Sequence, residues 1–240
     1  MKLKTLIYGK KFGICAFCGR KIKLCDSVFH EDNICICREC NSKIKIAPFN
    51  FLYEGTENLS FVIAPLYYTT VVREAVHKMK FMAVPKVSAA LAYYLNSYVS
   101  VFEETDEPLE NYFDVIVPVP LSDERKKNRG YNQAELIAIK LQEVLKLDIN
   151  TSLLIKVRNT SPQSNMMFSQ KSSNIKDAYL CMENIEGKRI LLVDDICTSC
   201  NTLDNCAKAL KKKGAAMVGA VAVARGFSER NSMLYNQLFS

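Results

Sequence analysis

Apolar runs and amphipathic segments alternate along the second half of the chain. Short, largely apolar runs occur at 114–119, 153–157, 190–193 and 217–224, and the run at 190–193 consists of branched apolar residues without interruption. Runs of this length are too short for helices, and unbroken apolar character is typical of strands buried on both faces. Amphipathic segments at 131–146 and 203–213 separate these runs and predict helices. The alternation therefore predicts an α/β fold in which helices flank a parallel sheet.

The first half of the chain has a weaker pattern. Residues 61–68 are apolar around an internal proline, which suggests an edge strand. Residues 71–82 and 86–101 carry apolar residues at helical spacing and predict two helices. On the first of these helices, His77 is interpreted as a surface or interface residue rather than a catalytic one.

Two polar connections are candidates for ligand contacts. The predicted loop at 121–130 holds Arg125 and Arg129, which are well placed for a diphosphate, although a solvated basic loop is the alternative. Residues 158–176 are polar and without periodicity, and a loop of this length is usually functional or disordered. A lid that closes over a substrate is the functional interpretation of this segment. A short strand at 178–181 is expected to follow it.

An acidic pair follows the apolar run at 190–193. Burying two carboxylates is costly, so we expect Asp194 and Asp195 at the carboxyl edge of the sheet. Ligands of open α/β sheets bind at that edge. The turn at 198–202 offers hydroxyls and free backbone N–H groups at a helix N-terminus, which is an anion site. Carboxylates beside a phosphate cradle suit a sugar phosphate.

Composition and charge narrow the class of protein. The chain has 240 residues, 49% of them hydrophobic and 24% charged, which is typical of a globular protein. No apolar run approaches the roughly 20 residues needed to span a membrane, and no signal peptide is apparent, so a cytoplasmic location is expected. The net charge is +7, with basic clusters near the N-terminus, at 125–129 and at 208–213. These clusters suit nucleic acid or polyphosphate, and solvated surface lysines are an equal alternative.

The cysteines predict a metal site. Six of the ten cysteines fall between residues 15 and 40, and without an export signal they argue against a disulfide framework. Two C-x-x-C pairs with 18 residues between them fit a four-thiolate structural zinc site, formed by Cys15, Cys18, Cys37 and Cys40. Cys35 in place of Cys37, or His30 as a ligand, are alternatives. The expected organisation is a zinc-binding module at 1–47 and an α/β domain at 48–240.

The stretch after the acidic pair resembles the phosphoribosyl diphosphate (PRPP) loop of type I phosphoribosyltransferases. That pattern is an apolar strand followed by D-D-[VI]-x-T-[TS]-G-x-T. The matching residues are Asp194, Asp195, Ile196, Thr198, Ser199 and Thr202. Cys200 stands where the pattern has glycine. If this position needs a positive φ, a residue with a Cβ costs about 1–2 kcal/mol there.

The chain as a whole resembles the ComF family of competence-associated, phosphoribosyltransferase-like proteins, which carry an N-terminal four-cysteine zinc module. The family patterns are L-K-[YF], then P-V-P…R…R-G-[YF]-N-Q, then R-x-T-x-x-Q with [RK]-x-x-N, and last the PRPP loop. The matching positions are 79–81, 118–120, Arg125, 129–133, Arg158, Thr160, Gln163, Lys171 and Asn174. The resemblance implies a type I phosphoribosyltransferase-like sheet and a role in DNA uptake with single-stranded DNA.

Two functional hypotheses follow from the resemblance. In the first, the chain is a phosphoribosyltransferase that binds PRPP with Mg²⁺. The implied PRPP site consists of Asp194, Asp195, Thr198, Ser199, Cys200 and Thr202, with Arg125 and Arg129 on the diphosphate. In the second, a non-catalytic protein reuses the pocket and holds single-stranded DNA on its basic surface, with competence proteins as partners. A scaffold with an inactive pocket is a third alternative.

Overall fold

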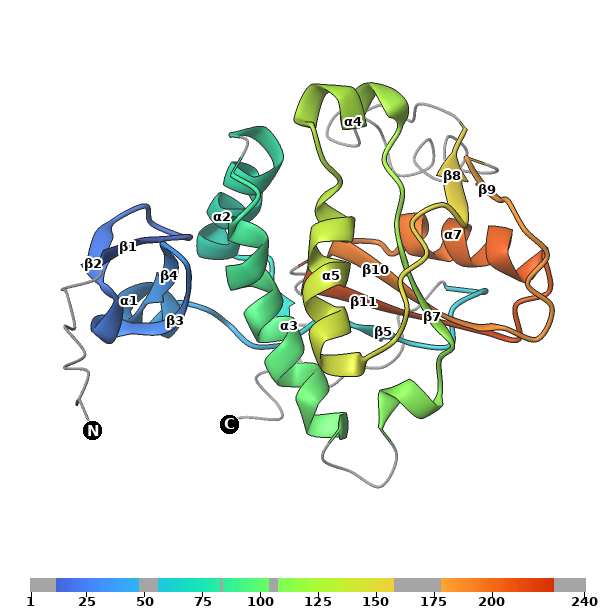
Figure 1. Ribbon diagram of the computed structural model, residues 1–240, viewed down its shortest axis with the longest axis horizontal. Helices are drawn as coiled ribbons and strands as arrows, with labels where there is room; N and C mark the ends of the chain where they lie inside the picture. The colour runs from blue at the N-terminus through green and yellow to red at the C-terminus, as the bar shows by residue number, and fades with distance from the viewer. Residues whose placement is uncertain (1–11, 48–55, 83, 104–107, 158–177, 227–240) are drawn as a thin grey trace, which may run out of the picture.

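The computed structural model describes residues 12–47, 56–82, 84–103, 108–157 and 178–226 (Figure 1). The predicted lid at 158–176 and the C-terminal tail lie outside the described residues. None of the described helices is long and apolar enough to cross a membrane.

A parallel sheet forms the centre of the chain, as the alternating pattern predicts. Its strands are β5 (Val62–Ile63), β6 (Leu66–Tyr67), β7 (Val115–Pro118), β10 (Arg189–Cys197) and β11 (Met217–Arg225). The order is β5-β11-β10-β7, and β6 pairs with β11 beyond β5. All of these pairings are parallel, which confirms the α/β fold class. β10 is longer than the predicted strand because it stays paired with β11 as far as Cys197 and Arg225.

Helices cover both faces of this sheet (Figure 1). The main helices are α2 (Thr70–Phe81), α3 (Val87–Glu103), α5 (Gln133–Leu145) and α7 (Asn201–Lys211). Side chains alternate across β10, so Leu191 belongs to the core that contains α2, α3 and α5, whereas Leu192 packs with α7. Each predicted helix is present, and the short η2 (Leu109–Asn111) precedes β7.

The strands predicted at 153–157 and 178–181 do not join the parallel sheet. They form a separate antiparallel pair, β8 (Leu154–Lys156) and β9 (Tyr179–Cys181). Before β8 the chain makes one parallel bridge, between Ile149 and Ile116 of β7. It then turns at Asn150, whose side chain accepts hydrogen bonds from the backbone of Ser152 and Leu153. That local turn diverts the chain from the sheet edge.

The predicted loop at 121–130 is also different, because it contains α4 (Asp123–Arg129). Its first turn is acidic and its last turn is basic, which complements the helix dipole. Gly130 ends the helix with a φ of 78°. The helix has no buried residue, so no apolar periodicity reveals it in the sequence.

The N-terminal segment forms a small sheet of its own with the strand order β2-β1-β4-β3. Its elements are β1 (Phe12–Cys15), β2 (Lys21–Lys23), η1 (Leu24–Asp26), β3 (Ser27–Glu31), β4 (Ile34–Cys37) and α1 (Arg38–Ser42). It lies against α2 and α3 (Figure 1). The Phe17 ring packs edge-on to Tyr94, and the Tyr94 hydroxyl donates to Asn41 over 2.7 Å. The segment therefore shares one continuous core with these helices.

Candidate functional site

The acidic pair lies at the carboxyl edge of the sheet. β7 ends at Pro118, opposite Val193, while β10 continues through Asp194 and Asp195 beside β11. One side of β10 is therefore without a strand partner from Asp194 onward among the described residues. This is the position at which open α/β sheets bind ligands.

Asp195 is buried and forms an ion pair with Lys80, which is not among the site residues predicted from the sequence. The Lys80 ammonium of α2 lies 2.6 Å from the Asp195 carboxylate. Burial alone would lower the pKa of Lys80, but the Asp195 charge outweighs it and raises that pKa. Lys80 belongs to the short 79–81 motif, so the resemblance to the L-K-[YF] pattern is the signal in the sequence that could have marked this lysine.

Asp194 points to the opposite face of β10, as alternation along a strand requires. Burial and the neighbouring Asp195 carboxylate raise the pKa of Asp194 to about 8. Lys156 of β8 and Tyr179 of β9 are close enough for their pKa values to respond to the Asp194 charge. The pKa of Lys156 is lowered, first by burial and then by Arg125. Asp194 therefore faces a different set of polar groups from Asp195.

Two sequence motifs meet beside Asp195. The Arg129 guanidinium lies 5.3 Å from the centre of the Phe81 ring and donates to Gln133 over 2.7 Å. Burial lowers the pKa of Arg129, and Asp195 opposes that change. The Tyr131 hydroxyl donates to the Met79 carbonyl. Contacts between 79–81 and 129–133 thus place two cations, Lys80 and Arg129, near one carboxylate.

The loop after β10 is left-handed at the position where the PRPP-loop pattern has glycine. Cys200 is the N-cap residue of α7 and has a φ of 52° and a ψ of 4°, in the left-handed region. Glycine adopts this region without steric cost, so the backbone at position 200 favours the glycine that the PRPP-loop pattern has there. Thr198 and Ser199 are exposed before it. A small pocket is lined by Asp194 and by residues 196–203.

A disulfide joins Cys197 and Cys200 within this loop. The other eight cysteines are free thiols, so the expectation of no disulfide framework needs one correction. The bond forms because the end of β10 and the left-handed N-cap of α7 place the Cα atoms of Cys197 and Cys200 5.1 Å apart, which is within the range for a disulfide.

The four predicted metal ligands come together in the N-terminal segment. The sulfur atoms of Cys15, Cys18, Cys37 and Cys40 all lie within 4.8 Å of one another. Zinc bound to thiolates at about 2.3 Å in a tetrahedron separates the sulfur atoms by about 3.8 Å, and Cys18 and Cys37 lie 3.9 Å apart. The donor set therefore fits a tetrahedral metal. Cys35 and His30 are not members of the described cluster.

Arg20 supports two of these sulfur atoms. Its guanidinium donates to Cys18 over 3.4 Å and to Cys37 over 3.9 Å, and it forms an ion pair with Glu39. Burial alone would raise the pKa of Cys18, but the Arg20 hydrogen bonds outweigh it and lower that pKa to about 6. Deprotonated thiolate is the form that binds metal.

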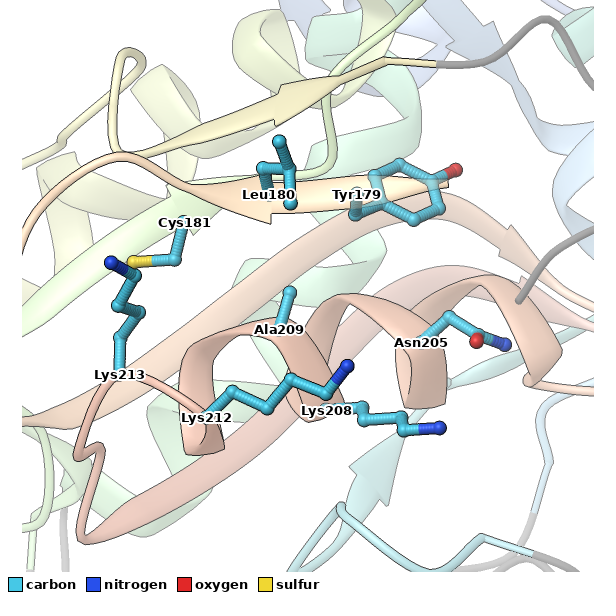
Figure 2. A pocket seen from close by; sticks show the side chains of 8 residues that line it. All are labelled: Tyr179, Leu180, Cys181, Asn205, Lys208, Ala209, Lys212 and Lys213. Atoms are coloured by element: carbon cyan, nitrogen blue, oxygen red, sulfur yellow. The ribbon is translucent and has the colours of Figure 1, made fainter. Parts of the chain in front are cut away.

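A second pocket lies between β9 and α7 (Figure 2). It is lined by Tyr179, Leu180, Cys181, Asn205, Lys208, Ala209, Lys212 and Lys213. We call it the β9–α7 groove. The lysines come from α7 and the turn after it, and none of the described residues that line the groove is acidic. The basic cluster at 208–213 therefore lines this groove with three of its lysines.

The comparison with known families defines the class. Residues 103–235, more than half of the chain, match the phosphoribosyl transferase domain family, so the chain belongs to that family. It is 26% identical over 210 residues to the DNA utilization protein YhgH of Salmonella typhi, covering 86% of this chain and 88% of that one. Together with the competence proteins described next, this relative places the chain in the ComF family.

Two competence proteins are similar to the chain. Competence protein F of Haemophilus influenzae is 30% identical over 115 residues, covering 47% of this chain and 50% of that one. Competence protein ComFC of Bacillus subtilis is 27% identical over 211 residues, covering 85% and 73%. Among solved structures, the purine phosphoribosyltransferase of Pyrococcus horikoshii has a TM-score of 0.31 and 17% identity, over 61% of this chain and 84% of that one.

Proposed function

We propose that the chain binds PRPP with Mg²⁺ at the carboxyl end of β10. The observation that carries this proposal is the left-handed residue at the start of α7, five positions after two carboxylates at the sheet edge. The backbone N–H groups of 201–203 and the hydroxyls of Thr198 and Ser199 would hold the 5-phosphate. Asp194 and Asp195 would accept hydrogen bonds from the ribose hydroxyls, and Thr202 completes the loop.

The two cationic side chains beside Asp195 supply the second part of the proposal. Arg129, with Arg125 of α4, would stabilise the diphosphate as it leaves C1 of the ribose. Lys80 would hold Asp195 ionised and in place through its ion pair. Mg²⁺ would be held mainly by oxygen atoms of PRPP, near the two aspartates. When bound, it would neutralise charge on the departing diphosphate. The proposed activity is therefore phosphoribosyl transfer from PRPP.

Calorimetric titration of the zinc-loaded protein with PRPP and Mg²⁺ tests this proposal. Thr198→Ala is expected to weaken binding by about 10- to 160-fold, because a hydrogen bond to a charged group contributes about 1.5–3 kcal/mol. The matched control is Thr151→Ala, which removes an exposed threonine before β8. Equal affinities of the two variants, or no binding by the wild type, would contradict the proposal.

We propose zinc as the metal of the four-cysteine cluster. Four thiolates close the tetrahedral shell, so the metal has a structural role and leaves no position for a substrate. The zinc-binding module would comprise residues 1–47, and the phosphoribosyltransferase-like domain residues 48–240.

For the cellular role, we propose cytoplasmic handling of single-stranded DNA during uptake. The names of the relatives, which refer to DNA utilization and competence, support this role. Outside the four-cysteine cluster and the disulfide, Cys25, Cys35, Cys181 and Cys206 are free thiols, which suits a reducing compartment. The β9–α7 groove supplies cations for the DNA backbone, since Lys208 and Lys212 are one helical turn apart, about 6 Å along the axis. Competence proteins are proposed as the partners.

The DNA proposal predicts a change in salt dependence. Replacing Lys208 and Lys212 with alanine is expected to reduce the slope of log K against log salt by about 1.4, because each lost single-strand phosphate contact contributes about 0.7. Fluorescence anisotropy with a labelled single-stranded oligonucleotide over a salt series measures this slope. Lys86→Ala with Lys188→Ala, both exposed and outside the groove and the basic clusters, is the control pair. An unchanged slope in the Lys208/Lys212 variant would remove the groove from the proposal.

A further inference from the structure

The disulfide between Cys197 and Cys200 lies inside the proposed phosphate loop. Cys197 is the last residue of β10, and Cys200 is the N-cap of α7. Both cysteines are buried, whereas Thr198 and Ser199 between them are exposed. The bond therefore closes a small ring whose exposed tip carries the hydroxyls that would face a phosphate.

The two ends of this ring are held in different ways. Cys197 is fixed by strand pairing with Arg225, and its carbonyl accepts a hydrogen bond from Gly226 over 2.9 Å. Cys200 starts the helix, since its carbonyl accepts from Asp204 over 2.8 Å, but its φ of 52° disfavours a residue with a Cβ. The disulfide is the covalent link that ties this unfavourable conformation to the fixed strand end.

We infer that this disulfide takes the place of the glycine in the PRPP-loop pattern, and that its reversible reduction controls ligand affinity. The inference rests on the proposed function. With the bond formed, the cross-link restricts the loop and keeps Cys200 left-handed, so the N–H groups of 201–203 point toward the phosphate. With the bond reduced, Cys200 relaxes toward negative φ and the cradle is distorted. The oxidised protein is thus the form that binds tightly.

The redox step is a thiol–disulfide exchange with an external disulfide, such as oxidised glutathione or a thioredoxin-type protein. Because Cys197 and Cys200 are buried in the closed loop, exchange requires the exposed 198–199 tip to open and uncover the sulfur atoms. One cysteine thiolate then attacks the external disulfide, forms a mixed disulfide and releases one thiol. The second cysteine thiolate then displaces the other external sulfur. In total, two protein thiols are oxidised to one disulfide, and one external disulfide is reduced to two thiols. Reduction is the reverse reaction with two external thiols.

The test compares PRPP binding, with Mg²⁺, to the full zinc-loaded chain equilibrated in oxidised or in reduced glutathione. Alkylation and mass spectrometry count the thiols in each sample, and zinc content shows that the four-cysteine cluster is intact. Reduction of the wild type is expected to weaken binding by about tenfold, which is about 1.4 kcal/mol. Cys200→Gly is expected to bind with one affinity in both conditions, tighter than the reduced wild type. Cys25→Ser removes an exposed thiol elsewhere and should respond to glutathione as the wild type does.

The outcomes separate this inference from the proposed function. Equal wild-type affinity in both conditions, tighter binding after reduction, or a wild type that forms no disulfide in oxidised glutathione would overturn the inference and leave PRPP binding standing. Absence of PRPP binding in every sample, including Cys200→Gly, would overturn the proposed function and this inference with it. A redox response that persists in Cys200→Gly would also overturn the inference, because that variant lacks the disulfide.

Discussion

Replacing Cys37 with serine is expected to release the metal and unfold the N-terminal sheet. In small zinc-binding peptides, a structural zinc contributes an apparent free energy of folding of about 10–16 kcal/mol. This is about as large as the whole free energy of unfolding of a small domain. Removing one of four thiolates forfeits most of that energy. The segment has no separate core to compensate, since Phe17 packs on α2 and α3 rather than within a core of its own.

Zinc content and hydrogen exchange measure this effect. The Cys37→Ser protein is expected to hold less than a tenth of the wild-type zinc and to exchange rapidly throughout β1–β4. Cys25→Ser is the matched control, because Cys25 is an exposed free thiol in the same segment and is not in the cluster. If both variants retain zinc and exchange alike, Cys37 is not a ligand and the four-cysteine assignment is wrong.

Replacing Lys80 with methionine is expected to destabilise the protein by about 3 kcal/mol. Breaking a buried ion pair costs about 3–5 kcal/mol because a charge is left buried and unpaired, and the partial exposure of Lys80 favours the lower end. Asp195 is then left without its partner. Urea denaturation of the zinc-loaded variant measures the free energy of unfolding.

The control for this variant is a lysine in a solvent-exposed pair. Lys86 lies 3.1 Å from Asp32, and both side chains are mostly exposed, so Lys86→Met should cost about 0–1 kcal/mol. Adding Asp195→Asn to Lys80→Met should recover part of the lost stability, because the unpaired charge is gone. If the Lys80 and Lys86 variants are equally stable, the buried pair does not have the role assigned to it.

The sequence predicts the architecture wherever burial leaves an apolar pattern. β7, β10 and β11 are buried and appear as apolar runs, and the four cysteines are revealed by their spacing. α4 escapes prediction because all its residues are polar or charged. The separate β8–β9 pair also escapes it, because an apolar run does not say which strand it will join.

The residues of the candidate site that lie in one short motif could be predicted from the sequence. The loop motif marks Asp194, Asp195 and Cys200 from their order along the chain. Lys80 lies more than a hundred residues earlier, and its contact with Asp195 depends on how α2 packs against the sheet. The disulfide depends on the left-handed backbone of Cys200, which brings this residue close to Cys197. The loop motif predicts that backbone conformation where glycine is present, and here the residue is cysteine. Contacts between distant segments were therefore the part that local patterns could not reveal.

Hydrogen exchange with and without PRPP and Mg²⁺ tests the central claim most directly, because it locates the ligand on the chain. Binding at the proposed loop predicts slower amide exchange in peptides that cover residues 194–203, with the β9–α7 groove unchanged. Slower exchange elsewhere with no change in 194–203, or no change at saturating PRPP, would contradict the claim that the loop after β10 binds PRPP.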